Sequence, residues 1–306
     1  MKLSACLFAC TLAAVAGRAA AQPAPQMHHM NEPPLAPMTG PAVSAPLTFT
    51  AGMPTVEVMV NGKGPFHLGF DTGAMGGVHI AAPAAERAGL AAVGEALVTD
   101  PSGRNPQHIK LYGQARVEVG GRAFTAMANE APTLARGKLA ALDGIAGLGL
   151  FGAGLVTIDY GKALITVEPG TLPPPDGHNI FAYQGPLPRL TVQVDGRPLE
   201  AHLDTGNVRA ALIVPEAFAD QLAGRATATD AGVAHTVSSA IPMFAVKLTG
   251  APRIGDTPLA VTEAQYPSVA TIGNVGSLAL QGLIVRVDTV NRRVQVLAPP
   301  VVGRTS

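Results

Sequence analysis

The tripeptide Asp-Thr-Gly occurs twice in this chain, within Phe70-Asp71-Thr72-Gly73-Ala74 and within Leu203-Asp204-Thr205-Gly206-Asn207. Each copy follows an apolar segment that begins shortly after a turn dipeptide, Asn61-Gly62 in the first case and Asp195-Gly196 in the second. Both dipeptides are typical of β-hairpins because their residues tolerate positive φ. A three-residue match carries little weight by itself, so the shared setting is the informative part. It predicts that the two copies are equivalent points of an internal repeat.

Other segments repeat in the same order around the two copies. Alternating apolar residues predict a hairpin before each aspartate, and Ala-rich segments that begin near a proline predict a short helix after it. Later in each half, residues 144–167 align without gaps on residues 273–296, which places Asp159 on Asp288. These two aspartates precede turn-like residues, so we expect them to make structural hydrogen bonds. The predicted hairpin strands are 55–60 with 66–70 and 190–194 with 199–203, and the predicted helices are 81–92 and 215–223.

The N-terminus has the pattern of an export signal. Lys2 precedes an apolar run over residues 3–17, and Ala19-Ala20-Ala21 offers a small-residue cleavage site. We therefore expect a periplasmic or secreted protein. The predicted division of the chain is a signal peptide at 1–21, a Pro-rich disordered linker or propeptide at 22–46, an N-terminal lobe at 47–172, an interlobe linker at 173–186 and a C-terminal lobe at 187–300.

Composition favours a mostly β fold and argues against two kinds of partner. The chain has 35 Gly and 27 Pro residues, and only 14% of its residues are charged. Many turns and few long charged helices are typical of such a composition. Lys+Arg and Asp+Glu balance at 21 each, so we expect no nucleic acid as a partner. No apolar run after the signal is long enough for a membrane span.

Metal and nucleotide chemistry have little support in the sequence. Both cysteines, Cys6 and Cys10, lie in the signal, and the eight histidines form no H-E-x-x-H pair. Residues 147–152 match G-x-G-x-x-G, but residues 155–160 alternate like a strand where a dinucleotide site needs a helix. We therefore expect no cofactor and no metal.

Two aspartates at equivalent points can work as an acid–base pair. Carboxyl groups in hydrogen-bonding contact do not both ionise readily, so the pair holds one proton and one negative charge. The ionised member takes a proton from water, and the protonated member donates to a substrate carbonyl. The glycine of each copy allows a sharp turn, and the threonines can cross-link the two loops through their hydroxyls. The candidate catalytic residues are Asp71 and Asp204, and the supporting loop residues are Thr72, Gly73, Ala74, Thr205, Gly206 and Asn207.

The duplicated motif resembles the pepsin/retropepsin-like aspartic peptidases, and in particular their exported bacterial members. The resemblance rests on residues 71–74 with Ile145-Ala146-Gly147 and on residues 204–207 with Asn274-Val275-Gly276, and it extends over about residues 50–298. It implies a mostly β, two-lobed acid-protease fold of duplicated retropepsin-like β-barrel lobes with short helices. It also implies a cofactor-free aspartic endopeptidase that cleaves a peptide or protein substrate lying between the lobes. A monomer is expected, and a dimer whose lobes pair between chains is the alternative.

Several features depart from the family pattern. Asn207 stands where the family has Ser, Thr or Ala, and Asn274 is polar where the family has an apolar residue. The segment expected to form the first flap, residues 98–109, has Ser102-Gly103 at its tip, and Tyr112 lies on the strand that leaves it. These departures put efficient proteolysis in question. The alternative function is a catalytically weak or inactive peptide-binding protein on the same fold.

Ala74 bears on the pH dependence of such an enzyme. A Ser or Thr at this position would donate a hydrogen bond to the charged form of Asp71 and lower its pKa, whereas Ala74 has no donor. We therefore expect a milder pH optimum than that of pepsin-type enzymes, above about pH 3.

Overall fold

Two β-sheets make up most of the protein, as the composition predicts. The computed structural model describes residues 35–98, 105–135, 139–235, 240–267 and 272–299. These residues belong to one compact unit that begins at Glu32. The predicted signal peptide and the first part of the predicted linker, up to residue 34, lie outside the described residues. None of the helices in the described part of the chain is long and apolar enough to cross a membrane.

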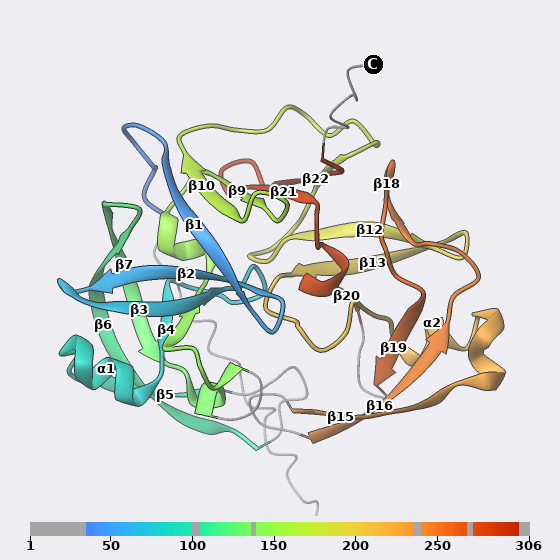
Figure 1. Cartoon of the computed structure of the whole chain (residues 1–306), viewed down its shortest axis with the longest axis horizontal. Helices are drawn as coiled ribbons and strands as arrows, with labels where there is room; N and C mark the ends of the chain where they lie inside the picture. The colour runs from blue at the N-terminus through green and yellow to red at the C-terminus, as the bar shows by residue number, and fades with distance from the viewer. Residues whose placement is uncertain (1–34, 99–104, 136–138, 236–239, 268–271, 300–306) are drawn as a thin grey trace, which may run out of the picture. The chain divides into compact units, whose positions relative to one another are not determined.

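The larger sheet has 13 strands and contains the described strands of the first half together with the last strands of the second (Figure 1). Its strand order is β11-β22-β21-β9-β10-β1-β2-β3-β8-β4-β7-β6-β5. The bounds are β1 Val43–Thr50, β2 Met53–Val60, β3 Lys63–Phe70, β4 Val78–Ile80, β5 Gly94–Val98, β6 Gln107–Val119, β7 Arg122–Glu130, β8 Gly144–Ala146, β9 Leu155–Asp159, β10 Leu164–Glu168, β11 Ile180–Ala182, β21 Ile284–Asp288 and β22 Arg293–Leu297.

The smaller sheet has 9 strands in the order β15-β16-β19-β14-β20-β13-β12-β17-β18. The bounds are β12 Arg189–Val194, β13 Arg197–Asp204, β14 Leu212–Ile213, β15 Thr229–His235, β16 Ala240–Lys247, β17 Arg253–Ile254, β18 Thr257–Pro258, β19 Glu263–Pro267 and β20 Gly273–Gly276. The helices are α1 Ala82–Ala88 and α2 Glu216–Ala219, and short 3-10 turns lie at Pro132–Ala135, Leu148–Phe151, Ala223–Thr227 and Ser277–Ala279.

The hairpin turns have the backbone that their dipeptides predict. Asn61 and Gly62 have φ of 51° and 74°, and Asp195 and Gly196 have φ of 48° and 77°. Positive φ at both central residues matches the twist of the strands that each turn connects. Both predicted helices are too long. α1 ends at Ala88, where Gly89 with φ of 70° caps it in the left-handed conformation, and α2 spans only Glu216–Ala219.

Both halves share one strand plan. In the first half, β3 pairs in parallel with β8, β8 pairs antiparallel with β4, and β4 pairs in parallel with β7. In the second half, β13, β20, β14 and β19 repeat these relations in the same order. The Asp-Thr-Gly copies lie at the ends of β3 and β13, the equivalent strands of the two halves. The internal repeat expected from the sequence is therefore present in the pairing of the strands.

The two halves meet in the larger sheet through the antiparallel pair β9 and β21. The gapless alignment of 144–167 on 273–296 places Thr157 on Arg286, and these two residues are partners across the pair. Asp159 pairs with Ile284 and Leu155 pairs with Asp288. Because Leu155 aligns on Ile284 and Asp159 on Asp288, exchanging the two halves leaves this set of pairs unchanged. The register is thus symmetric about the Thr157–Arg286 pair, so β9 and β21 are related by a local twofold axis.

Both segments that we expected to be linkers contain a strand of this shared sheet. β1 begins at Val43, inside the predicted disordered segment 22–46, and its first residues pair with β10. β11 lies inside the predicted interlobe linker 173–186 and pairs with β22 at the equivalent place. The predicted disorder is therefore wrong for the described part of this segment, where Ala36 and Met38 also form backbone hydrogen bonds with Ala153. The proline content concealed the strand, but Pro46 lies where β1 leaves β10 for β2, a position that needs no ladder hydrogen bond from it.

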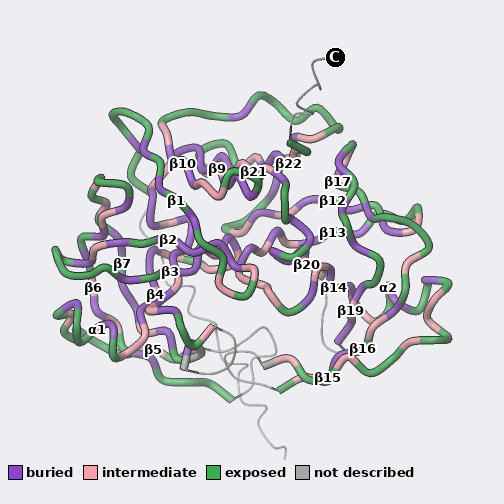
Figure 2. The backbone as a smooth tube through the Cα atoms, in the orientation of Figure 1, coloured by how far each residue is buried: buried purple, intermediate pink, exposed green. Residues whose placement is uncertain are grey.

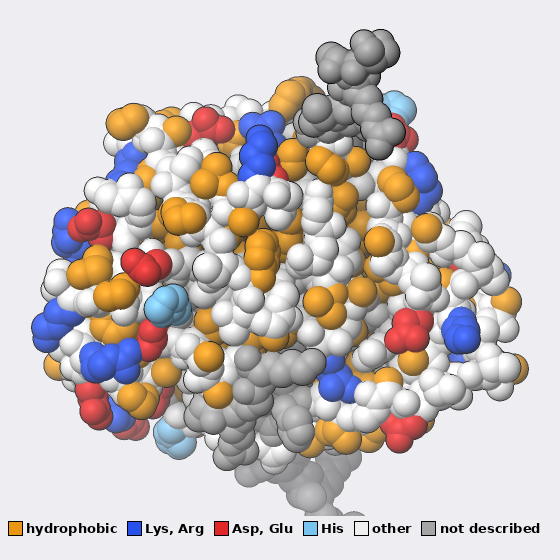
Figure 3. Space-filling view, viewed as in Figure 1, with side chains coloured by type: hydrophobic (Ala, Val, Ile, Leu, Met, Phe, Trp, Pro, Cys, Tyr) orange, Lys and Arg blue, Asp and Glu red, His pale blue; other side chains and the backbone are white. Residues whose placement is uncertain are grey.

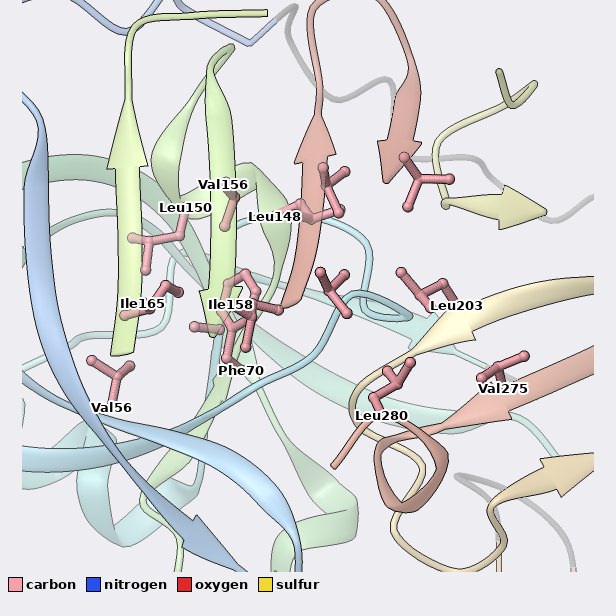
Figure 4. Packing of buried hydrophobic residues seen from close by; sticks show 14 of the residues in the cluster. Val56, Phe70, Leu148, Leu150, Val156, Ile158, Ile165, Leu203, Val275 and Leu280 are labelled. Carbon is pink, nitrogen blue, oxygen red and sulfur yellow. The ribbon is translucent and has the colours of Figure 1, made fainter. Parts of the chain in front are cut away.

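One cluster of buried apolar side chains runs through both halves. Figure 4 shows members of this cluster from both halves, with Phe70, Val156 and Ile158 from the first and Leu203 and Val275 from the second. Figure 2 shows that buried residues follow the strands of both sheets. Because the cluster is continuous, apolar side chains of both halves contribute to one core, and its burial stabilises both halves together.

The two later aspartates are structural, as their position before turns predicts. Asp288 is fully buried and accepts hydrogen bonds from the backbone N–H groups of Leu172, Val290 and Asn291 at 2.9, 3.0 and 2.9 Å. Asp159, its repeat equivalent, accepts one from Lys162 N–H at 2.9 Å. Asp288 therefore joins its own turn to the segment between the halves, whereas Asp159 holds only its own turn.

We expect Asp288→Ala to lower the free energy of unfolding by about 2–4 kcal/mol, because it leaves buried backbone N–H groups without an acceptor. The matched variant Asp159→Ala loses a turn bond nearer the surface and should cost about 1 kcal/mol. Urea unfolding followed by far-UV circular dichroism measures both values. Equal losses in the two variants would contradict this assignment.

Candidate active site

Each Asp-Thr-Gly copy lies at the more buried end of a strand. In β3 the side chain of Phe70 is 0% exposed, and in β13 that of Leu203 is also 0% exposed. The backbone N–H of Asp71 donates to Ala146 O at 2.9 Å, which joins the first loop to β8. Both site aspartates remain partly exposed. Packed strands therefore hold both loops while leaving the aspartates within reach of solvent.

The two threonines cross-link the loops through reciprocal hydrogen bonds. Thr72 Oγ1 donates to Leu203 O and Thr205 Oγ1 donates to Phe70 O, each at 2.6 Å. Each hydroxyl oxygen also accepts the backbone N–H of the opposite threonine, at 3.0 and 3.1 Å. Both threonines are 0% exposed, so these four bonds face no competition from water. The contact anticipated from the sequence is present.

The glycines of the two copies are needed because each loop lies close to the opposite carboxyl group. A Cβ added to Gly73 would lie 2.8 Å from Cγ of Asp204, and one added to Gly206 would overlap the carboxyl of Asp71. Either side chain would force the loops apart. Glycine at these positions therefore allows the two carboxyl groups to approach each other.

The carboxyl groups of Asp71 and Asp204 form one electrostatic unit. Burial and then the negative charge of Asp204 raise the pKa of Asp71 well above its usual value, and a side-chain hydrogen bond between the two adds to this. Backbone N–H groups of Gly73, at 2.7 Å from Oδ1, and of Gly206 act in the opposite direction. The net effect is that the pair keeps a proton at a pH where an isolated aspartate has lost it.

Asn207 and Asn274 contact each other and one of the two carboxyl groups. Asp204 Oδ1 accepts the backbone N–H groups of Gly206 and Asn207, both at 3.0 Å. Its Oδ2 accepts Nδ2 of Asn274 at 2.6 Å. Asn207 Nδ2 in turn donates to Asn274 Oδ1 at 2.8 Å. The sequence marked both residues as unusual but gave no sign that they lie together.

The glycines of the later repeat elements let those elements pack against the aspartate loops. A Cβ on Gly147 would lie 2.7 Å from Ala74 O and Gly76 O, and one on Gly276 would lie 2.6 Å from Asn207 O. Real Cβ atoms do not approach backbone oxygens so closely. Any larger residue at either glycine would therefore displace an aspartate loop.

A buried chain of hydroxyl groups beside the pair was not predicted. Ser277 Oγ donates to Gly52 O at 2.7 Å, so its oxygen accepts the hydroxyl of Tyr160 at 2.8 Å. Burial raises the pKa of Tyr160, and the charges of the two site aspartates add to this, so the phenol stays neutral. Ser277 N–H also donates to Asn207 O at 2.9 Å. The signal that could have indicated this role is that Ser277 directly follows the repeat glycine.

The remaining candidates have structural partners. His79 Nε2 lies 2.8 Å from Met75 O, and Nε2 of His202 accepts the Nε–H of Arg189 at 2.8 Å. No group of three metal-ligating side chains occurs among the described residues. The G-x-G-x-x-G match forms a single 3-10 turn at Leu148–Phe151, and the strand β9 follows it. β9 is the strand that the sequence predicts over 155–160, at the place where a dinucleotide site would need a helix.

The segment expected to be a flap is described only in part. β5 and β6 pair antiparallel, with Val98 opposite Gln107, so the two arms form a hairpin. The expected tip, Ser102-Gly103, lies outside the described residues. Tyr112 lies on β6, the strand that leaves the tip, and its side chain is buried.

Comparison with known proteins gives no family for this chain. No protein-family model matches the sequence, and no curated protein matches it. Its function is therefore argued from the geometry of the site.

We expect Thr72→Val and Thr205→Val each to lower the free energy of unfolding by about 2–5 kcal/mol. Valine keeps the shape of threonine but leaves a buried N–H and a buried C=O of the opposite loop unpaired. The control variants Thr72→Ser and Thr205→Ser keep the hydroxyl and should cost about 1 kcal/mol. Urea unfolding followed by circular dichroism tests this. Valine variants as stable as the serine variants would argue against the cross-link.

Asp71 should make the stability of the protein depend on pH. A carboxyl group whose pKa is higher in the folded than in the unfolded state favours folding below its unfolded pKa, and this contribution is lost as the pH rises through the folded pKa. Asparagine mimics the protonated carboxyl and does not titrate. We therefore expect Asp71→Asn to raise Tm by at least about 2–4 °C at pH 7 and to leave it nearly unchanged at about pH 3.

Thermal unfolding at the two pH values measures this difference, with Asp159→Asn as the control that should show no gain at pH 7. The same change in Tm at both pH values would mean that Asp71 does not hold the proton.

Proposed function

We propose that this protein is an aspartic endopeptidase with the two-lobed acid-protease fold of the pepsin/retropepsin-like family. The observation that carries the proposal is the pair of loops that the buried threonines cross-link, which holds the carboxyl groups of Asp71 and Asp204 in hydrogen-bonding contact. The repeated strand plan supports it, because each half supplies one loop from the same position.

The chemistry follows from the shared proton. The ionised carboxylate takes a proton from a water molecule as the water oxygen attacks the carbonyl carbon of a peptide bond, and the protonated carboxyl donates to the carbonyl oxygen. As the C–N bond of the tetrahedral intermediate breaks, the carboxyl that took a proton from water gives it to the nitrogen. The other carboxylate takes a proton back from a hydroxyl of the intermediate, and an amine and a carboxylic acid are released. The pair then again holds one proton and one negative charge.

The proposed substrate is an extended segment of a peptide or protein, bound partly by strand-like backbone hydrogen bonds. Acidic and basic side chains are interspersed on the face shown in Figure 3, and neither kind gathers into a large patch there. This supports a peptide rather than a polyanion as the ligand. The export signal proposed for residues 1–21 would place the enzyme in the periplasm or outside the cell.

The test is hydrolysis of a mixed peptide library by the purified protein, with and without pepstatin. We expect Asp71→Asn and Asp204→Asn each to reduce the rate at least about 100-fold, because each removes one half of the acid–base pair. The matched control Asp159→Asn changes an aspartate of the repeat outside the site and should retain activity. The rate of the wild type should peak above about pH 3, since Ala74 offers no side-chain donor to Asp71.

Hydrolysis that survives both substitutions would end the proposal. Binding of library peptides without hydrolysis by the wild type would instead favour the alternative, a peptide-binding protein with little or no turnover.

A further inference from the structure

The orientation of the two asparagine side chains near Asp204 is fixed by donors that cannot reverse. The backbone N–H groups of Arg209 and Ala210 donate to Oδ1 of Asn207 at 3.1 and 3.3 Å. A backbone N–H can only donate, so Oδ1 of Asn207 is the acceptor and its Nδ2 points away from these groups. Backbone N–H groups alone therefore orient the side-chain amide of Asn207.

The orientation of the Asn207 amide in turn fixes that of the Asn274 amide. Nδ2 of Asn207 donates to Oδ1 of Asn274 at 2.8 Å, so Nδ2 of Asn274 faces the other way, toward Oδ2 of Asp204 at 2.6 Å. The chain of hydrogen bonds thus presents a donor to Asp204. A charged carboxylate oxygen is a stronger acceptor of such a bond than an oxygen of the neutral acid. The arrangement therefore favours the ionised form of Asp204.

The first half lacks this arrangement. Ala74 occupies the position equivalent to Asn207, and Ile145 occupies the position equivalent to Asn274. Neither has a side-chain donor, so the hydrogen bonds to Asp71 come from backbone groups and from Asp204. The repeat therefore has one carboxyl group with a side-chain amide donor and one without.

We propose that Asn274, oriented by Asn207, is a positioning residue that keeps Asp204 as the ionised member of the pair, so that Asp71 carries the shared proton. The catalytic roles rest on the proposed function. In them, Asp204 takes the proton from water and Asp71 donates to the carbonyl oxygen. The location of the proton itself does not depend on turnover.

Other groups near the pair do not account for this asymmetry. Tyr160 is neutral in the acidic range, since the ordinary pKa of a tyrosine is about 10 and burial raises the pKa of this one further. His202, on the same strand as Asp204, has its pKa lowered by burial and then by the charge of Arg189. A protonated His202 would also favour an ionised Asp204, but His202 is the same in the wild type and in variants of Asn207 or Asn274. A comparison of those variants with the wild type therefore isolates the amide donor.

The test combines two variants with a matched control. Asn274→Leu has a similar shape but no donor, and Asn207→Ala leaves Asn274 in place without its orienting partner. Ile145→Leu makes a comparable change at the equivalent position of the first half. In the pH profile of kcat/KM, we expect the acidic limb to move up by about one pH unit in Asn274→Leu, less in Asn207→Ala and not at all in Ile145→Leu.

A second readout needs no activity. Carbon-13 NMR titration of the aspartate carboxyl groups in the full chain should show Asp204 ionising at lower pH than Asp71, and Asn274→Leu should reduce that separation. Earlier ionisation of Asp71, or an unchanged separation in Asn274→Leu, would overturn the inference. Hydrolysis that depends on both aspartates, with an acidic limb unaffected by either asparagine variant, would overturn it while leaving the proposed function intact. If the titration shows the expected order but the protein hydrolyses no peptide, the inference stands and the proposed function is overturned.

Discussion

The reciprocal hydrogen bonds between Thr72 and Thr205 are the constraint on which the site depends. They join two loops that are 133 residues apart in the chain, and both hydroxyl groups are buried. Because each hydroxyl donates to one backbone carbonyl and accepts one backbone N–H of the opposite loop, the two loops can occupy only one relative position. Gly73 and Gly206 can then approach the opposite carboxyl groups, and the charge of Asp204 can act on Asp71.

The symmetry of the backbone does not extend to the chemistry of the side chains. Strand pairings repeat between the halves, and the β9–β21 register is symmetric about Thr157 and Arg286. The hydrogen bonds around the carboxyl groups differ, because one half has two asparagines where the other has Ala74 and Ile145. This asymmetry of donors on a symmetric frame is the basis for the proposal that Asp204 is the ionised member of the pair and Asp71 the protonated one.

The parts of the fold predicted from the sequence are those that depend on local signals. Asn61-Gly62 and Asp195-Gly196 adopt positive φ because Asn and Asp tolerate this conformation and Gly has no Cβ, so the hairpins and the positions of the aspartates could be predicted. β1 and β11 could not, since their strand conformation comes from pairing with β10 and β22. The contact of Asn207 with Asn274 spans 67 residues of sequence. The roles assigned to the site residues remain predictions for the experiments described.

The register of β9 and β21 also bears on how the two halves depend on each other. β9 pairs with β10 on one side and with β21, its equivalent in the second half, on the other. A first half on its own would therefore present an open sheet edge whose natural partner is a second copy of the same edge. Joining the halves in one chain supplies that partner at a high effective concentration that dilution does not reduce. It also gives every molecule one half of each kind, which two separate identical chains could not do.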